Sequence, residues 1–357
     1  MSPPPLRTTT ATTAFATPVP RTYQSEEVLE WRFPRPWNNY VLTGRSRAAW
    51  HTSFVIPQLN LLLDAGLCVN RERPKHIFLT HGHCDHTLLA PTFVKRDDPP
   101  DIFCPAEMRH ALDEFVRAKT LLNLGGHLTV DEVEEADREK TKKLQAEEGT
   151  EGEDTDDGNN HHHHQSSTGV YRRLLTHVTH GIQDGDVVDL RRTKNITAQA
   201  FRCDHTVPCL GYVFRATTNR LKPEYTPLQN DGEALKKLRE SGVEITAPVT
   251  TPMFAFLGDT TAATLAADPS WLRDGIAVVI TECSFLDERH RARAAKTKHT
   301  IWADLEKVIR SHPKTTFVLM HFSLRYEDED IRRFFTQMED PPSNIVVWID
   351  GQPADTA

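Results

Sequence analysis

The sequence predicts an α/β fold, in which short strands alternate with helices. Two observations carry this prediction. Runs rich in β-branched and aromatic residues recur along the chain and end at polar, glycine or proline positions, as strands do. Segments of helical character lie between these runs, an order that packs helices against the faces of a sheet.

The expected elements follow in chain order. The strands are 53–66, 76–81, 101–105, 196–201, 209–214, 252–259, 276–282, 315–321 and 344–350. The helices are 106–122, 232–241, 262–273, 301–310 and 331–338. No internal repeat is visible, so one fold is expected to use all of these elements.

We expect a single domain over residues 23–357, preceded by a disordered tail. Residues 1–22 are rich in Ser, Thr and Pro and lack the apolar core of a secretory signal. No apolar run approaches the roughly 20 residues of a membrane span. The six cysteines form no CxxC pair, which is typical of a reducing compartment. We therefore expect a cytoplasmic protein without membrane contact, with mitochondrial or nuclear targeting left open.

A low-complexity insert, residues 131–168, interrupts this domain. Within it, residues 131–157 hold 13 Asp and Glu against four Lys and Arg, a balance of −9, whereas the whole chain carries −8. The remainder is thus close to +1, so acidity does not exclude a polyanionic substrate. The run His161–His164 has no rigid geometry in its Gly, Asn and Ser surroundings, and we interpret it as linker rather than a metal site.

Five expected strands lead directly into a residue that can bind metal or carry a proton. These residues are His81, His205, Asp259, Glu282 and His321. Functional groups at strand ends converge where sheets open, and rigid scaffolds usually build their sites there. The pattern predicts one shared site.

The stretch "THGHCDHT", residues 80–87, is the densest part of this pattern. His81 and His83 are two apart in an extended segment, so both imidazoles can point the same way. Asp85 and His86 follow at the expected start of a helix, and Gly82 frees the backbone to turn. Imidazole and carboxylate together suit zinc or another borderline transition metal rather than magnesium or calcium.

These residues resemble a known family. "HGHCDH" resembles the HxHxDH signature of the metallo-β-lactamase superfamily. "HTVPCLGY" from His205, "GDT" at 258–260, "ECSFLDE" from Glu282, "KHT" at 298–300 and "HFSLRY" from His321 resemble its ribonuclease Z branch. The resemblance spans residues 40–350 in the right order. It implies a four-layer αββα sandwich and metal-dependent hydrolysis of phosphodiesters, with RNA among the eligible substrates and a homodimer allowed.

The resemblance also implies a ligand set. Three imidazoles would hold one metal: His81, His83 and His205. A carboxylate and two imidazoles would hold the second: Asp85, His86 and His321. Asp259 would bridge the two ions, expected to be zinc, with manganese or iron as alternatives. Asp64, in "LLLDAG", matches the aspartate that braces the ligand loop and orients an imidazole.

Three residues are implied in catalysis: Asp85, Glu282 and His299. Asp85 would also orient the nucleophile or accept its proton. Glu282 would hold His299 and raise the pKa of its imidazole, so that His299 is partly protonated near neutrality. The basic segment 288–298 lies between this pair. It is read equally well as a grip for a polyanion or as a solvated face.

The sequence departs from the branch in one interval. Transfer-RNA-processing members carry a long basic arm between the third-motif histidine and the bridging aspartate. Here residues 211–258 contain a short helix, mixed charge and no Gly-Pro motif, and we expect them to be too short for such an arm. Cleavage of small phosphodiesters with poor cutting of transfer RNA is therefore expected. A glyoxalase-type thioester hydrolase, and a weakly active metal-binding scaffold whose acidic insert binds protein partners, remain the alternatives.

Overall fold

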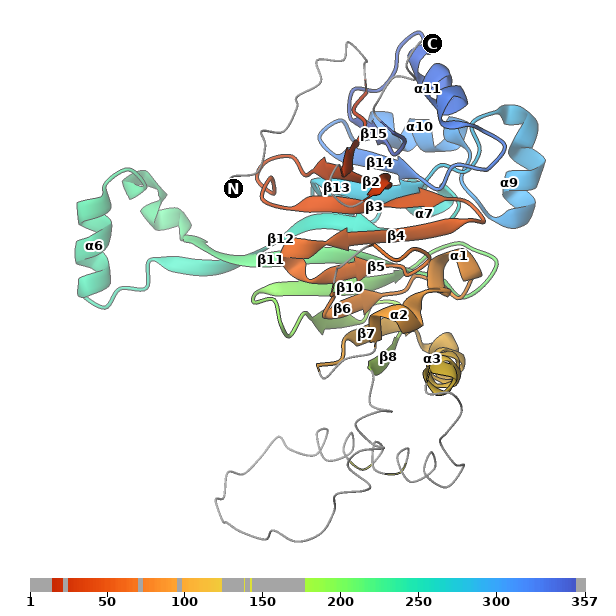
Figure 1. Cartoon of the computed structure of the whole chain (residues 1–357). Helices are drawn as coiled ribbons and strands as arrows, with labels where there is room; N and C mark the ends of the chain where they lie inside the picture. Colours follow the sequence, from red (N-terminus) through yellow and green to blue (C-terminus); the bar gives the residue numbers. More distant parts are fainter. Residues whose placement is uncertain are drawn as a thin grey trace, which may run out of the picture.

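Two mixed sheets packed face to face form the centre of the molecule (Figure 1). The computed structural model describes residues 15–21, 25–69, 73–94, 98–123 and 177–350, and the single residues 138 and 142. In the first sheet the strands follow the chain in order, and the second sheet runs in the order β15 to β9. In chain order, the strand pairs of each sheet are antiparallel at first. They become parallel from β5 onward in the first sheet and from β12 onward in the second.

The strands have these bounds. The first sheet consists of β1 (Val19–Arg21), β2 (Ser25–Arg32), β3 (Val41–Arg47), β4 (His51–Ile56), β5 (Leu61–Leu63), β6 (His76–Phe78), β7 (Asp101–Pro105) and β8 (Val178–Ile182). The second consists of β9 (Val187–Asp189), β10 (Ile196–Arg202), β11 (Leu210–Leu221), β12 (Thr246–Phe256), β13 (Val278–Glu282), β14 (Thr316–Met320) and β15 (Ile345–Val347). β2 and β3 belong to the core sheet although the sequence did not single them out.

Helices cover the outer faces of the two sheets, and one further helix, Gly232–Glu240, lies away from them. The α-helices are α1 (Cys84–Thr87), α2 (Ala90–Val94), α3 (Arg109–Asn123), α6 (Gly232–Glu240), α7 (Ala263–Ala266), α8 (Ser270–Arg273), α9 (Arg291–Thr297), α10 (Trp302–Ser311) and α11 (Asp328–Thr336). Short 3-10 turns are η1 (Pro57–Leu59), η2 (Ala106–Met108), η3 (Pro223–Leu228) and η4 (Glu288–His290). The helix expected over 262–273 is two helices, because Asp268 has a positive φ of 51° and Pro269 follows it.

Successive side chains along a strand point alternately into two apolar layers, one on each face of its sheet. This arrangement confirms the predicted αββα sandwich. Along β4, Phe54 and Ile56 face the cluster between the sheets, whereas Val55 faces the cluster under α2 and α3. Along β14, Val318 enters the central cluster and Phe317 packs under α10 and α11. This period of two gives each sheet two buried faces, so helices must cover both outer sides.

A long hairpin projects from the second sheet between β11 and β12 (Figure 1). The two strands stay paired out to Leu221 and Thr246, and η3 and α6 form the tip. The expectation that this interval is too short for an arm is therefore wrong, because the strands continue beyond the core as a two-stranded ribbon. Its charge is mixed, as the sequence indicated: residues 217–250 carry five basic and five acidic side chains. We call residues 217–250 the arm.

The N-terminal boundary also differs from the prediction. Residues 15–21 were expected in a disordered tail, yet Phe15 is buried against Phe335 and Val19–Arg21 pairs with β2. Ala16 forms a bridge with Val346 at the edge of the second sheet. Phe15 supplies the apolar surface that fixes this segment. Residues 1–14 and, apart from two single residues, the insert 131–168 with His161–His164 lie outside the described part of the chain.

None of the helices in the described ranges is long and apolar enough to cross a membrane.

Candidate metal centre

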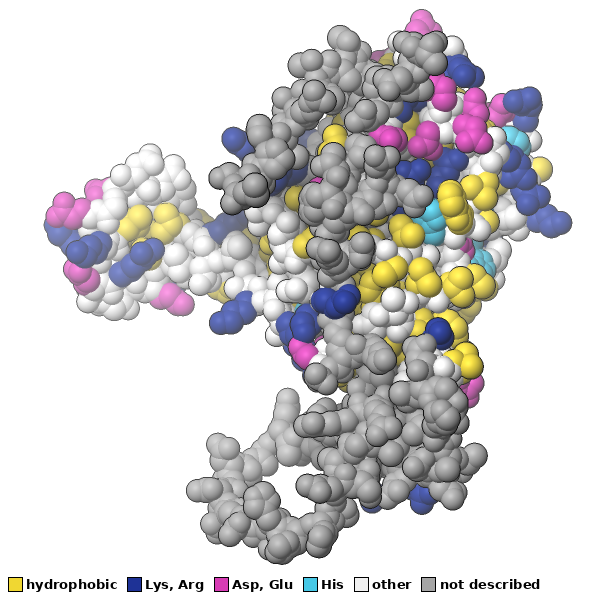
Figure 2. Space-filling view, in the orientation of Figure 1, with side chains coloured by type: hydrophobic (Ala, Val, Ile, Leu, Met, Phe, Trp, Pro, Cys, Tyr) yellow, Lys and Arg dark blue, Asp and Glu magenta, His cyan; other side chains and the backbone are white. Residues whose placement is uncertain are grey.

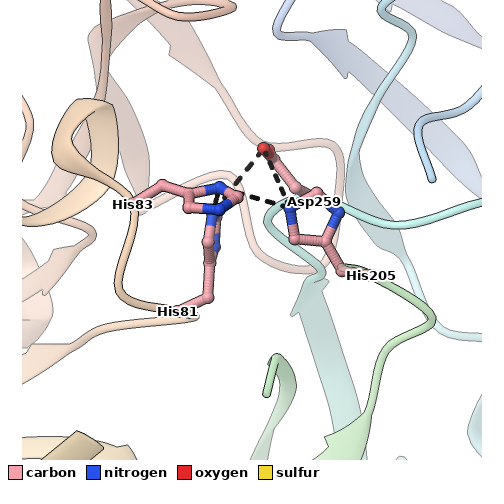
Figure 3. A group of neighbouring side chains, drawn as sticks. All are labelled: His81, His83, His205 and Asp259. Atoms are coloured by element: carbon pink, nitrogen blue, oxygen red, sulfur yellow. Dashed lines mark hydrogen bonds and ion pairs between the residues drawn. The ribbon is translucent and has the colours of Figure 1, made fainter. Parts of the chain in front are cut away.

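The first group of converging side chains comes from the loop after β6 and from two loops of the second sheet. The Nε2 atom of His81 and the Nδ1 atom of His83 are 3.0 Å apart, and the Nε2 atom of His205 is 3.3 Å from the same Nδ1 atom. Asp259 closes the group, with Oδ2 3.7 Å from His81 Nε2 and 4.0 Å from His205 Nε2 (Figure 3). Four ligand atoms thus point into one small space.

The second group lies directly beside the first. His86 and His321 present their Nε2 atoms to each other at 3.3 Å, and His321 Nε2 is 3.4 Å from Asp85 Oδ2. The Oδ1 atom of Asp259 is 3.3 Å from both of these imidazole nitrogens. Asp259 therefore turns one oxygen to each group.

Buried lone pairs test whether these residues fit metal ions. Asp259 is 1% exposed, and its Oδ1 accepts no well-formed hydrogen bond from any described residue. Leaving a buried carboxylate oxygen unpaired is costly, and pointing imidazole nitrogens at one another is no better unless a cation lies between them. Burial also lowers the pKa of His81, His83 and His205, which favours the neutral imidazole that a metal requires. The donor set fits two transition-metal ions.

Acceptors behind the imidazoles fix their orientation. His86 donates from Nδ1 to Asp64 at 2.7 Å, and His205 donates from Nδ1 to the carbonyl of Lys298 at 3.0 Å. Asp64 also accepts from the backbone N–H of Thr80 at 2.8 Å and from the Thr80 hydroxyl at 2.9 Å. These bonds leave Nε2 of each imidazole free to face the centre, which is how outer residues set a ligand tautomer.

Two further contacts were not anticipated from the sequence. The hydroxyl of Ser284 lies 3.1 Å from His321 Nδ1 and donates to Glu282 Oε2 at 2.6 Å. The backbone N–H of Ala49, in the turn between β3 and β4, donates to Asp85 Oδ2 at 2.8 Å. A single serine near a motif could have been noticed, but a backbone donor from a distant turn has no signature in the sequence.

The two sheets meet closely at the centre, where Gly258 is required. Its φ is +62°, and a Cβ atom there would lie 2.5 Å from the Thr80 hydroxyl oxygen. Only glycine combines this left-handed backbone with such close approach. Because Thr80 binds Asp64 and precedes His81, the contact sets the position of both ligand groups relative to each other.

Glu282 and His299 form the expected pair at the edge of the centre. His299 Nδ1 is 2.8 Å from Glu282 Oε1, and the backbone N–H groups of Thr260 and Thr300 donate to the two oxygens of Glu282 at 2.7 and 3.1 Å. Burial disfavours the charge on His299, but the carboxylate of Glu282 outweighs burial and raises the pKa of His299 to about 9. Its other nitrogen is left to face the cavity.

A cavity of about 430 Å³ opens above these residues. Asp85, Asp259 and His299 are among the residues that line it, and Arg293 and Arg325 contribute cations. The basic segment 288–298 is mostly neutralised: Arg289 pairs with Asp287, Arg291 with Glu288 and Asp304, and Lys298 with Asp204. Arg293 and Lys296 form no ion pair within the described ranges, and of these two only Arg293 lines the cavity, so the segment offers the cavity one cation rather than a basic surface.

Comparison with known proteins agrees with this fold. Residues 61–180 match the model of the metallo-beta-lactamase superfamily. Two proteins of Arabidopsis thaliana are similar over most of the chain. "tRNase Z TRZ2, chloroplastic" is 26% identical over 87% of this chain and 75% of its own length. "tRNase Z TRZ1" is 26% identical over 85% of this chain and 92% of its own length.

Among solved structures, the short form of human tRNase Z covers 86% of this chain and 95% of its own, with 14% identity and a TM-score of 0.45. The match over residues 61–180 and the two packed sheets together give the chain the metallo-β-lactamase fold. The predicted resemblance to the ribonuclease Z branch is confirmed by the curated relatives.

Proposed function

We propose that the chain is a binuclear metal-dependent hydrolase that cleaves phosphodiester bonds and that RNA is its substrate class. The observation that carries the proposal is Asp259, whose two oxygens face two separate groups of ligand atoms. The names of the curated relatives support RNA as the substrate class. The ions are proposed to be zinc, with manganese or iron as alternatives.

The site residues divide into holding and reacting groups. His81, His83 and His205 would hold one ion and Asp85, His86 and His321 the other, with Asp259 shared. Bound in such a pair, the ions would lower the pKa of a water and polarise the oxygens of a phosphodiester. Asp85, fixed by the N–H of Ala49, is placed to orient the nucleophile and take its proton.

His299 would supply a proton on the other side of the phosphorus. Glu282 holds its Nδ1 atom, so the proton to be transferred sits on Nε2 in the cavity. Since Glu282 keeps the imidazole protonated, His299 can donate to the leaving oxygen or bind a phosphoryl oxygen. A thioester hydrolase of glyoxalase type shares the ligand set but not this pair, so the pair favours the diester. A weakly active scaffold would not need His299 at all.

Metal analysis and a substrate panel test the proposal. Purified protein freed of chelator should contain two transition-metal ions per chain; one ion or none with intact ligands would contradict the binuclear centre. The panel contains a chromogenic diester, a 3′-extended transfer RNA, a thioester and a β-lactam. Thioester cleavage without diester cleavage would instead support the glyoxalase type.

Transfer RNA is the informative member of the panel. The expectation of poor transfer-RNA cleavage rested on a missing arm, and it now depends on charge alone, because the arm exists but its charges balance. Phosphate contacts dominate affinity for nucleic acid. Efficient, salt-sensitive cutting would show that the arm, or another surface, grips the RNA despite this balance. Cytoplasmic location and a homodimer remain predictions, which fractionation and sedimentation would check.

A further inference from the structure

An exposed tryptophan stands beside the mouth of the cavity. Trp50 is 62% exposed, although a tryptophan side chain is on average highly buried in folded proteins. It follows Ala48 and Ala49, which line the cavity, in the turn between β3 and β4. Leu324, another lining residue, is 53% exposed. Figure 2 shows hydrophobic side chains beside histidines on this face.

The turn that carries Trp50 is held rigidly against the centre. The backbone N–H of Ala49 donates to Asp85, that of Ala48 to the carbonyl of Phe322 at 3.2 Å, and that of Trp50 to the carbonyl of Arg47 at 3.2 Å. The ring of Trp50 contacts that of His51 at an interplanar angle of 58°, with centroids 4.5 Å apart. The indole is therefore positioned before any ligand arrives, which reduces the entropy lost on binding.

We propose that Trp50 is a stacking platform for the unpaired nucleobase next to the scissile phosphate. This inference rests on the proposed function, because it assigns the base of the substrate whose phosphate enters the cavity. An indole offers a flat apolar face, and bases of any identity stack on such faces. Trp50 follows Ala49, which lines the cavity and whose N–H donates to Asp85, so the turn carries the exposed indole beside the cavity rather than within its lining.

The charge around the cavity supports a nucleotide rather than an apolar partner. Arg293 lines the cavity without an ion pair among the described residues, and Arg325 lines it with its guanidinium 5.9 Å from the centroid of the Phe285 ring. An apolar protein surface would leave these cations beside the cavity unpaired. A ligand that carries an anionic group and a planar ring would match both the cations and the exposed indole. A lone exposed side chain would need no explanation, but one beside a cationic cavity does.

Two diesters with the same leaving group distinguish recognition of the base from recognition of the phosphate. The 4-nitrophenyl ester of thymidine 5′-monophosphate carries a base, and methyl 4-nitrophenyl phosphate does not. Trp50→Ala should lower kcat/KM for the first by about tenfold or more, the usual effect of removing a stacking ring, and leave the second nearly unchanged. Trp50→Phe should retain most of the preference and Trp50→Leu should lose it, since leucine is apolar but not planar. Leu122→Ala, which removes a side chain that is 74% exposed on α3, is the matched control.

A binding measurement keeps this inference separate from the proposed function. Calorimetry should show tighter binding of thymidine 5′-monophosphate than of inorganic phosphate, and Trp50→Ala should abolish the difference. If the wild type cleaves neither diester but still binds the nucleotide more tightly through Trp50, the proposed function fails and the platform stands. If Trp50→Ala lowers kcat/KM equally for both diesters, or changes neither cleavage nor binding, the proposed stacking role of Trp50 is overturned.

Discussion

The metal centre and the arm are built in opposite ways. At the centre, His81, His86 and Asp259 are almost wholly buried and are held by side chains and backbone groups from both sheets. In the arm, β11 and β12 lose their buried positions as they leave the core, and neither η3 nor α6 buries any residue. The arm is held mainly by its own backbone ladder, and Ile245 is its one buried hydrophobic side chain.

This difference separates what a substitution can do in each region. A ligand at the centre shares its neighbours with several others, so removing one disturbs a network in which effects are not additive. A residue of the arm contacts mainly its own ribbon and water, where single exposed contacts contribute little. We therefore expect the centre to determine activity and metal content, and the arm to affect only the substrates it can reach.

The largest effect is expected from Asp259→Ala. It removes the carboxylate whose two oxygens face the two ligand groups, so metal analysis should show the loss of one or both ions. Diester turnover should fall by more than about 10⁴-fold, beyond the loss of a single acid–base group. Asp259→Asn keeps the shape and lacks the charge. If Asp259→Asn retains two ions and normal turnover, the carboxylate does not bridge.

His299→Ala should lower diester turnover by roughly 10²–10⁴-fold while metal content stays constant, because His299 supplies a proton and is not proposed as a ligand. Turnover and bound metal are measured on the same preparation. His110→Ala on α3, where the histidine is exposed, is the matched control. A loss of metal in His299→Ala would move His299 from the reacting groups to the ligands.

Acid should destabilise the core through a histidine that the site does not use. Burial lowers the pKa of His76 at the start of β6, and Asp101 only partly opposes this. The unfolded chain therefore holds that proton at higher pH than the folded chain. Stability from His76 is complete above the unfolded pKa of 6.5 and is lost as pH falls below it, by at most about 1.4 kcal/mol per pH unit. Urea unfolding at two pH values should show a smaller acid loss for His76→Leu than for the wild type or His110→Leu.

Shortening the arm tests whether it contributes to the metal centre. Thr218 and Val249 are paired across the ribbon, so residues 219–248 can be replaced by a two-residue turn without moving the core. Metal content and cleavage of a small diester should be unchanged. The 3′-extended transfer RNA is assayed in parallel. A lower rate of cleavage for both the small diester and the transfer RNA would show that the arm stabilises the centre itself.

The smallest effect is expected on α6 at the tip of the arm. Lys237 and Glu233 form an exposed pair one helical turn apart, 3.2 Å between charged atoms. Such pairs contribute roughly 0.3–0.5 kcal/mol at most, so Lys237→Ala should leave the melting temperature almost unchanged. A fall of several degrees would mean that the tip packs more tightly than its exposure indicates.

Most of the centre could be predicted from the sequence for a physical reason. Glu282 and His321 end neighbouring parallel strands, whose carboxyl ends meet at the same edge of a sheet, and Asp259 follows a third. Residues set at strand ends in this way must converge, wherever the loops go. Asp64 came from the family resemblance instead; it follows β5, which pairs in parallel with β6.

The parts that were missed depend on distant contacts. The arm extends because β11 and β12 pair with each other across 24 intervening residues, which no local pattern of the mixed-charge interval reveals. The burial of Phe15 is fixed by Phe335, at the other end of the chain. Ser284 acts through His321, and its partner is known only once β13 and β14 are aligned.

The spread of the ligands along the chain has a consequence during synthesis. His86 and His321 face each other but are 235 positions apart. At ribosomal rates of about 5–20 residues per second, the later histidine is made about 10–50 s after the earlier one. The growing chain then presents a cluster of imidazoles with no second sheet behind it, open to any metal in its surroundings. The second group of side chains can therefore be completed only after translation has nearly ended, so a ribosome that stops before residue 321 releases a chain that lacks one of its members.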